Sequence, residues 1–509
     1  MTQFPDERWL LRAWWTGVAV LFALTYLLAP VKDPDFFWHL NTGEWILQHR
    51  ALPAADPFSA GTGGAVDPRQ YFILTSYWLA QLGYALLYAL AGWGGFFIAR
   101  AAILWLMIRA LLARRHAWPL GYAVLVATFL VLLFARFPVE RPQFLSFLAF
   151  AVVVALLERL GEARDTLPRD VAWGLPVVML LWGNVHGGVL LGQILCAAHL
   201  LNNARRGWCG EISREFFCRS AALLAGAALI ALATPNLTNY LPAYRETLDP
   251  KYQPFFALNL EYRSLYQLVA VERVWIYLFF PVIVLLAGYE LLRDGLRRNL
   301  MQCVLLLCFA WFAFNSVRYL PFLGILALPA AGNGLARFGR QAGAVLLLLL
   351  FVGGIANSYQ HLDNLRRLVR NGPLSVKFPQ QAVEFVRQSG LRGNLLNDYD
   401  WGGYLGWALG EEHKVFVDGR TLDVEKYNDW VLLAGVLGGA QLGDEKHIDH
   451  FGKDRIVDHV LRKYRIDYMI LPKSAGREPF WLSVAVAANP GWKAVYSDRQ
   501  AVVFVRTGP

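Results

Sequence analysis

The sequence predicts a mainly α polytopic membrane protein, with about eleven transmembrane helices followed by a C-terminal extracytoplasmic α/β domain. Apolar runs of roughly 16 to 20 residues recur through the first 355 positions, and each is long enough to cross a bilayer core. Only 17% of the 509 residues are charged, whereas soluble domains carry about 25%. From residue 374 onward the pattern changes to short strands and amphipathic helices, which indicates a domain outside the membrane.

The apolar runs give the predicted spans in order. One long stretch, 71–90, contains Ser76, Gln81 and several tyrosines, so we expect it to lie in the membrane interface as an amphipathic helix. The spans themselves are expected at about 13–31, 95–112, 119–135, 143–157, 172–186, 188–203, 219–234, 275–292, 300–315, 319–333 and 342–356.

The arginines predict the orientation of these spans. With the N-terminus in the cytoplasm, the inner loops are all rich in arginine, as the positive-inside rule requires. They are 109–116, 158–170, 202–220, 293–299 and 336–341. The net charge of +10 therefore needs no nucleic-acid partner. The sequence therefore predicts three parts of the chain: a transmembrane domain, 1–356, with an outer loop 32–94; a linker, 357–373; and an outer α/β domain, 374–509.

The acidic stretch DPDFFWHL follows the first span on the outer side. Asp33, Asp35 and His39 could ligate Mg²⁺ or Mn²⁺, since such cations prefer oxygen ligands and also bind phosphates. Either aspartate could instead act as a general base toward an acceptor hydroxyl. The structural alternative is a helix cap, with Asp35 at the start of FFWHLNTGEWILQH.

Other polar residues gather at the predicted outer ends of the spans. Arg136 and Arg141 flank a turn that contains Glu140, and Arg318 lies between two later spans. Guanidinium groups there could recognise a phosphate, or simply reach the interface from a span end. Asn184, His186 and Glu261 are further candidates for a ligand-binding cavity. Packing against neighbouring helices is the alternative for Asn184 and His186.

The last domain carries two glycine-containing motifs, NDYDWGGYLGW (397–407) and VFVDGR (415–420). Their patterns favour tight turns after strands. We expect strands at NLLNDY, KVFVD, DYMILP, KAVYSD and AVVFVRT, and helices at KFPQQAVEFVRQSG and DHVLRKY. The chain contains no phosphate-binding P-loop, no GxSxG nucleophile motif and no zinc-ligand spacing.

This layout resembles the C-type glycosyltransferase superfamily, the polytopic enzymes that use lipid-linked sugars. The likeness rests on the Asp33-Pro34-Asp35 motif after the first span, the interfacial helix before the second span, and the outer domain after about eleven spans. A closer likeness is to bacterial members of the superfamily, through DPDFFWHLNTG, Arg141-Pro142-Gln143, Asn184 to Gly188, and the two C-terminal motifs.

The resemblance implies a transferase in the bacterial cytoplasmic (inner) membrane, with a periplasmic or extracellular C-terminal domain. Such an enzyme would move a sugar from a polyprenyl-phosphate carrier, its lipid-linked donor, to an unidentified glycan, lipid or protein acceptor. Asp33 or Asp35 would be the catalytic or metal-binding acid. Glu140 would lie near the acid of the second outer loop of oligosaccharyltransferases, although those enzymes have a D-x-D-like pair where this chain has Val139-Glu140.

In the same reaction Arg136, Arg141 and Arg318 would stabilise the departing lipid phosphate, and His39 and His186 would line the cavity. The alternatives are a non-catalytic scaffold or lipid-binding partner that keeps this fold, and a transporter. Transport is disfavoured because the polar residues gather at one membrane face, whereas transporter sites usually lie near the midplane.

Overall fold

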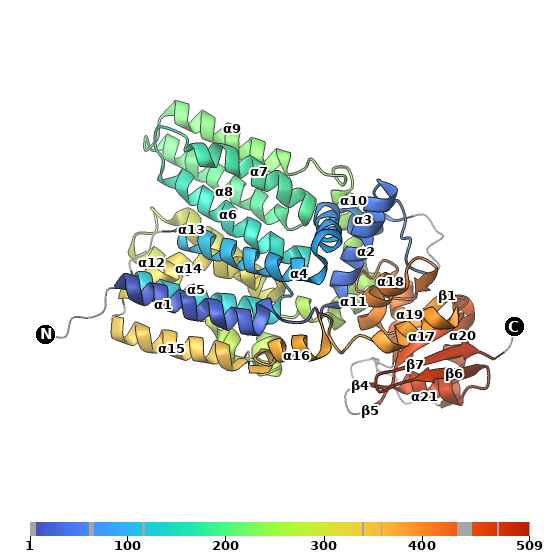
Figure 1. The fold of residues 1–509 in the computed structure, drawn as a ribbon. Coiled ribbons are helices and arrows are strands. Elements are labelled where there is room, and N and C mark those ends of the chain that lie inside the picture. Colours follow the sequence, from blue (N-terminus) through green and yellow to red (C-terminus); the bar gives the residue numbers. More distant parts are fainter. Residues whose placement is uncertain are drawn as a thin grey trace. The chain divides into compact units, whose positions relative to one another are not determined.

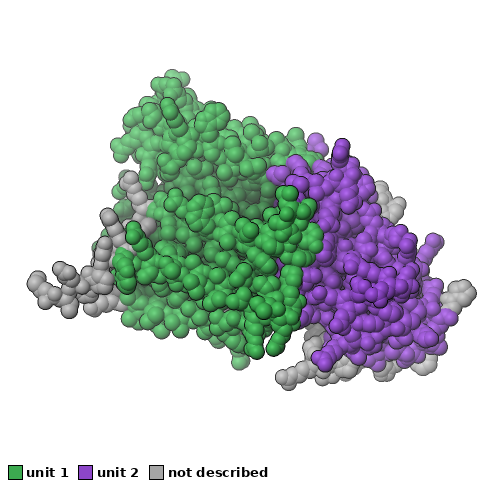
Figure 2. All heavy atoms as spheres, viewed as in Figure 1, with its two compact units in different colours: residues 1–30, 87–237, 257–373 green, residues 31–86, 238–256, 374–509 purple. Residues whose placement is uncertain are grey.

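The computed structural model describes residues 7–60, 66–114, 118–337, 340–357, 359–434, 450–475 and 478–507. The chain forms two compact units (Figure 2). The helical unit comprises residues 1–30, 87–237 and 257–373, and the sheet unit comprises residues 31–86, 238–256 and 374–509. The sheet unit therefore takes the C-terminal domain together with two segments that precede it by more than a hundred residues.

Helices make up the first unit (Figure 1). Each predicted span overlaps a helix, because a long apolar run satisfies its backbone hydrogen bonds internally as a helix. The first, predicted at 13–31, is helical only as far as Leu27. The helices are α1 (Glu7–Phe22), α4 (Trp78–Leu112, which contributes to both units), α5 (Pro119–Arg136), α6 (Pro142–Glu162), α7 (Arg169–Val185), α8 (Val189–Trp208), α9 (Arg214–Ile230), α12 (Phe279–Arg293), α13 (Leu300–Asn315), α14 (Leu320–Arg337) and α15 (Arg340–Asn357).

Six helical stretches in the described ranges are long and apolar enough to cross a bilayer, so the chain is a multi-pass membrane protein. The count of eleven crossings stays a prediction, since α7, α8, α9, α13 and α15 are not among these six stretches. The six stretches are Trp9–Leu27, Pro68–Leu112, Pro119–Arg136, Pro142–Glu162, Trp275–Arg293 and Val317–Arg337.

Aromatic rings fill the centre of the helical unit. Phe322 on α14 packs edge-on against Phe147 and Phe150 of α6, with ring centroids 5.1 and 5.0 Å apart. Edge-to-face pairs of this kind add about 0.5–1.5 kcal/mol beyond the area they bury. Close helix packing continues at Gly183, where an added Cβ would lie 2.2 Å from the carbonyl oxygen of Ala231.

The backbone of α4 breaks at Gly92, whose φ of 54° and ψ of −146° are not helical. This conformation is strained for residues that carry a Cβ atom, and glycine adopts it at no steric cost. The break separates residues 78–91 from the apolar half. The predicted interfacial helix, 71–90, is divided between residues 68–75, which form a separate helix, and this first half of α4. The position of the first half in the membrane interface stays a prediction.

A five-stranded sheet forms the second unit, in the order β2-β1-β3-β7-β6. The strands are β1 (Gly393–Asn397), β2 (His413–Val415), β3 (Tyr468–Pro472), β6 (Trp492–Ser497) and β7 (Ala501–Arg506). The first three are parallel, and β7 and β6 add antiparallel. The predicted strands are thus present, and α17 (Gln380–Ser389) ends at Gly390 in the left-handed conformation, as expected.

Further helices of the sheet unit come from all three of its segments. From the early segments come α2 (Pro34–His49), α3 (Pro68–Thr75) and α10 (Tyr240–Thr247), with α11 (Gln253–Leu258) at the boundary. The C-terminal segment supplies α18 (Gly402–Leu409), α19 (Val424–Ala434), α20 (His450–Lys463) and α21 (Trp481–Ala488), together with a two-stranded ribbon of β4 (Ser474–Ala475) and β5 (Glu478–Pro479).

The loop after α2 extends this sheet. The amide of Ala60 donates to the carbonyl of Val415 at 2.9 Å, and the amide of Val415 donates to the carbonyl of Phe58 at 3.0 Å. Residues 58–60 therefore cover the edge of β2 that β1 leaves open. Closing a sheet edge in this way satisfies backbone groups that would otherwise be unpaired.

Candidate functional site

Asp33 caps the helix that carries the acidic motif. Its Oδ1 accepts the backbone N–H of Asp35 at 3.0 Å, Pro34 occupies the first helical turn, and the Asp33 side chain is buried. The alternative that Asp35 is the cap is wrong by two residues. The reason is that Pro34 has no N–H to lose and its fixed φ suits the first helical position, so the helix begins before Asp35.

Asp35 lies in the first turn of α2, where its charge is favoured by the helix dipole. Its carboxylate touches the backbone at Gly419, since a Cβ added there would lie 1.7 Å from Asp35 Oδ1. Burial raises the pKa of Tyr399 well above its ordinary value, and the nearby charge of Asp35 adds to this shift. The hydroxyl of Tyr399 also lies 3.2 Å from Thr421 Oγ1. Both C-terminal motifs therefore surround Asp35.

A buried ion-pair network fixes the turn that contains Gly419. Arg420 Nε lies 2.9 Å from Asp418 Oδ2, and Arg420 Nη1 lies 2.8 Å from Asp56 Oδ1. These three side chains are at most 4% exposed. Burial alone would raise the pKa of Asp56, but the charge of Arg420 and the hydrogen bonds from Arg420, Ser59 and the Phe58 amide together lower it. The network ties the loop after α2 to the turn against which Asp35 rests.

His39 is packed rather than open to a ligand. Its ring stacks on Trp38 with centroids 3.5 Å apart, meets Tyr77 edge-on at 5.1 Å, and lies 3.4 Å from the amide nitrogen of Gln81. Nowhere in the described ranges do three or more His, Cys, Asp or Glu side chains form a group that could hold a metal ion. Asp33, Asp35 and His39 therefore do not form such a group of three: Asp33 caps α2, and His39 packs against aromatic rings.

Asp398, in the motif that also contains Tyr399, has a strongly raised pKa. Burial and the neighbouring charge of Asp400 raise the pKa of Asp398 to about 7, against 3.8 ordinarily. Its side chain also accepts the N–H of Asp400 at 3.0 Å. The position was not among the predicted site residues, because the local sequence indicated only a turn.

This raised pKa predicts a pH dependence. Between pH 3.8 and about 7 the folded state holds a proton that the unfolded state releases, so the contribution of Asp398 to stability falls as the pH rises through this window. We expect Asp398→Asn to flatten the dependence of the thermal midpoint on pH from 5 to 8, and to raise the midpoint at pH 8. Differential scanning fluorimetry of the detergent-solubilised chain measures both. Unchanged slopes in wild type and variant would contradict the prediction.

The helical unit brings several predicted residues together around Glu261. Arg141 Nη1 lies 2.7 Å from Glu261 Oε1, and the side chains are each 21% exposed. Burial would raise the pKa of Glu261, but the charges of Arg141, Arg318 and Arg136 together lower it. We call Arg136, Arg141 and Arg318 the arginine triad. It places three guanidinium groups near one carboxylate.

Arg318 and His186 complete this part of the unit. Arg318 Nη1 donates to the hydroxyl of Tyr262 at 2.8 Å. The Arg318 guanidinium is close enough to His186 for the two side chains to interact electrostatically. His186 Nδ1 accepts the N–H of Gly188 at 2.8 Å, which fixes the ring at the turn after α7. Since Nδ1 is used as an acceptor, the remaining nitrogen is the one that can carry a proton.

Two predicted residues have packing partners elsewhere in the helical unit. Glu140 forms a buried ion pair with Arg100, which also donates to the carbonyl of Leu27 at 3.0 Å. The pair thus fixes the end of the first span. Asn184 is buried and donates to the carbonyls of Leu180 and Ala233, each at 3.0 Å. Arg100 was missed because it lies inside an apolar run with no local signal.

Comparisons with known proteins add to these observations. No protein-family model matches the sequence, and no curated protein matches it either. Solved structures do match. The arabinofuranosyltransferase AftD from Mycobacteria has a TM-score of 0.59 at 15% identity, with 99% of this chain and 40% of AftD covered.

Two further structures match over almost the whole chain. Archaeal oligosaccharyltransferase AglB from Archaeoglobus fulgidus, in complex with an inhibitory peptide and a dolichol-phosphate, has a TM-score of 0.58 at 11% identity, covering 98% of this chain and 74% of AglB. ArnT from Cupriavidus metallidurans, bound to undecaprenyl phosphate, has a TM-score of 0.53 at 14% identity, covering 98% of each chain. The resemblance stated from the sequence is confirmed for the fold: this chain has the polytopic fold of the C-type glycosyltransferases.

Proposed function

We propose that this protein is a membrane glycosyltransferase that moves a sugar from a polyprenyl-phosphate carrier to an acceptor outside the cytoplasm. The observation that carries the proposal is the arginine triad, because it gathers three guanidinium groups around Glu261, and guanidinium groups are well suited to binding a phosphate. The fold supports it, since AglB and ArnT share the fold and were solved with dolichol-phosphate and undecaprenyl phosphate respectively.

In the proposed reaction Asp35 removes the proton from the acceptor hydroxyl. The acceptor oxygen then forms a bond to the anomeric carbon of the sugar, while the bond from that carbon to the carrier's phosphate oxygen breaks. The configuration at carbon inverts, because the new bond forms opposite the leaving group. The arginine triad stabilises the negative charge that develops on the departing lipid phosphate. The cap from Asp33 fixes the backbone of Asp35, and the backbone at Gly419 lies against its carboxylate.

No metal takes part in this proposal. One AglB structure was solved as a complex with Zn and sulfate. In this chain the only predicted ligand set, Asp33, Asp35 and His39, is not gathered as three donors in the described ranges. The step is therefore derived from Asp35 and the arginine triad alone.

The proposed location is the bacterial cytoplasmic membrane, with the N-terminus in the cytoplasm and residues 374–509 outside. The support is the arginine content of the loops at one end of the helices, including 158–170 and 293–299. The triad residues lie at the opposite ends of those helices: Arg136 closes α5, Arg141 precedes α6, and Arg318 lies between α13 and α14.

Substitution of Arg318 tests the phosphate assignment. We expect Arg318→Gln to weaken binding of undecaprenyl phosphate by about tenfold, which is the effect of losing one charge-assisted hydrogen bond. Arg263→Gln is the matched control, because Arg263 lies in the same region of the chain and pairs with the exposed Glu272. Isothermal titration of the lipid in detergent micelles measures both. Equal losses in the two variants would contradict a role for the triad.

A further inference from the structure

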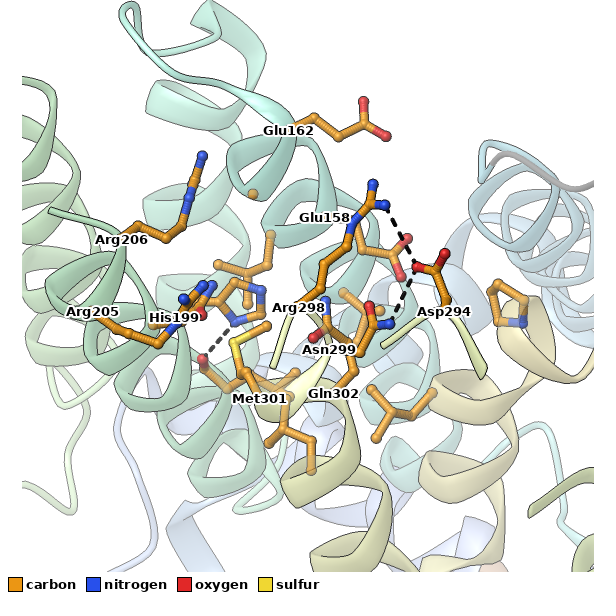
Figure 3. A pocket seen from close by; sticks show the side chains of 18 of the residues that line it. Glu158, Glu162, His199, Arg205, Arg206, Asp294, Arg298, Asn299, Met301 and Gln302 are labelled. Atoms are coloured by element: carbon orange, nitrogen blue, oxygen red, sulfur yellow. Dashed lines mark hydrogen bonds and ion pairs between the residues drawn. The ribbon is translucent and has the colours of Figure 1, made fainter. Parts of the chain in front are cut away.

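A strongly charged cavity lies in the helical unit, with a volume of about 870 Å³ (Figure 3). Its walls come from α6, α8, α13, α14 and the loop between α12 and α13. The charged lining consists of six arginines, three glutamates and one aspartate: Arg114, Arg164, Arg205, Arg206, Arg297, Arg298, Glu158, Glu162, Glu211 and Asp294.

Most of the carboxylates in this cavity are already held by arginines. Glu158 pairs with Arg114, and Asp294 lies 3.8 Å from Arg298. Glu211 lies 3.1 Å from Arg205 and 3.7 Å from Arg206.

Two arginines of the lining lack such a partner. Arg164 and Arg297 have no carboxylate within 4 Å among the residues that the structure describes, and both are exposed. The remaining acid of the lining, Glu162, is also exposed and does not cancel the surplus. The cavity is therefore net positive.

Part of this charge is buried inside the unit. Arg206 is 7% exposed, and its guanidinium donates to the carbonyl of Ala163 at 3.0 Å and to Asn203 Oδ1 at 3.3 Å. His199 is also buried, with Nδ1 3.0 Å from the carbonyl of Leu195. A buried guanidinium is costly to desolvate, and an anion bound beside it offsets that cost.

The cavity also has an apolar wall. It is formed by Val154 and Leu157 of α6, Leu195 of α8, Leu305 of α13 and Leu326 of α14. A lining with arginines on one side and aliphatic side chains on another suits an amphipathic ligand: the arginines bind a phosphate, and the apolar wall takes the first carbons of an attached chain.

This site is distinct from the arginine triad. Arg141 lies directly before α6, whereas Glu158 and Glu162 lie in its last turns. A helix of 21 residues spans about 30 Å. The cavity is thus at the end of the helices with the arginine-rich loops, which the positive-inside rule assigns to the cytoplasm. Basic pockets between transmembrane helices on that side commonly bind phosphate headgroups.

We propose that this cavity binds a phosphate-bearing anion through Arg206 and the unpaired Arg164 and Arg297, with the apolar wall accepting the start of an acyl chain. The proposal adds a second anion site to the chain and does not depend on glycosyl transfer. The anion is either the headgroup of a phospholipid of the inner leaflet or a soluble phosphate, and the test below distinguishes these two ligands.

The test titrates the detergent-solubilised full chain with dihexanoyl phosphatidic acid, dihexanoyl phosphatidylcholine and inorganic phosphate, by isothermal calorimetry. We expect phosphatidic acid to bind, and the double variant Arg164→Gln with Arg297→Gln to lose at least about tenfold in affinity. The matched control is Arg159→Gln with Arg219→Gln. This control also removes two positive charges. Arg159 and Arg219 are each 61% exposed, each pairs with a nearby carboxylate, and neither lines the cavity. We expect it to bind like wild type.

The other outcomes of the titration either identify the ligand or overturn the proposal. Binding of inorganic phosphate with an affinity equal to that of phosphatidic acid supports the anion site and makes its ligand a soluble phosphate. Equal losses in the test and control variants, or equal binding of phosphatidylcholine, would overturn the proposal. Arg206→Gln provides a further check deeper in the cavity. A folded Arg206→Gln variant that binds phosphatidic acid like wild type also contradicts it.

Discussion

Replacing Asp35 with asparagine is expected to reduce the turnover number for sugar transfer by about 10²- to 10⁴-fold, because loss of a general base has an effect of that size. The variant keeps its shape and its hydrogen-bonding atoms, so binding of the lipid carrier should change little. The measurement is release of radiolabelled sugar from a panel of polyprenyl-phosphate sugars, using full-length protein in nanodiscs, with and without added divalent metal.

Asp33→Asn is the matched comparison for Asp35→Asn. Asparagine is as good a helix cap as aspartate, so this variant should keep the start of α2 and most of the activity. If Asp33→Asn is inactive while Asp35→Asn is active, the base is Asp33 and the assignment made here is wrong. If a folded wild-type protein transfers no sugar from any member of a broad panel, the proposal of a transferase fails and a lipid-binding scaffold replaces it.

Arg420→Met is expected to destabilise the sheet unit by about 3–5 kcal/mol, because it leaves the buried carboxylates of Asp56 and Asp418 without their counter-charge. The measurement is hydrogen–deuterium exchange of β1 and β2 in the solubilised full chain. Their amides should exchange at least about 10²-fold faster than in wild type.

Arg392→Met is the control for this effect, because it breaks an arginine–glutamate pair in the same unit. Arg392 and Glu412 are 66% and 63% exposed, and an exposed pair contributes at most about 1 kcal/mol. Similar exchange rates in the two variants would show that the buried network contributes no more than a surface pair.

Much of the fold follows from local pattern. The apolar runs predict helices because the backbone of a membrane span has to bond to itself. The strands of the last domain are predicted by short runs rich in β-branched and aromatic residues, and most residues of β1, β3 and β7 are buried in succession. The segment 58–60 gave no such signal, yet it bonds to β2, because its partner and not its own sequence determines that conformation. Arg100 in its apolar run is a similar case: only its contact with Glu140 explains it.

In the candidate site, too, the local sequence predicted some features, and others depend on contacts between distant residues. The residue types at Asp35, Arg141, Glu261 and Arg318 indicated charge chemistry, and the structure brings the last three together. The VFVDGR motif was interpreted as turn chemistry, and it does form a turn. That its glycine lies against Asp35 could not be predicted, because nothing local relates residues so far apart in the sequence.

The edge pairing of residues 58–60 with Val415 has a consequence for how the protein is made. The ribosome has synthesised the acidic motif and all the helices of the helical unit before β1 and β2 exist. Domains generally fold in the order in which they emerge. Asp35 therefore lacks its neighbours Tyr399 and Gly419 until the last quarter of the chain has been translated. A nascent chain that stops before residue 393 would hold every predicted span, and no completed site around its acid.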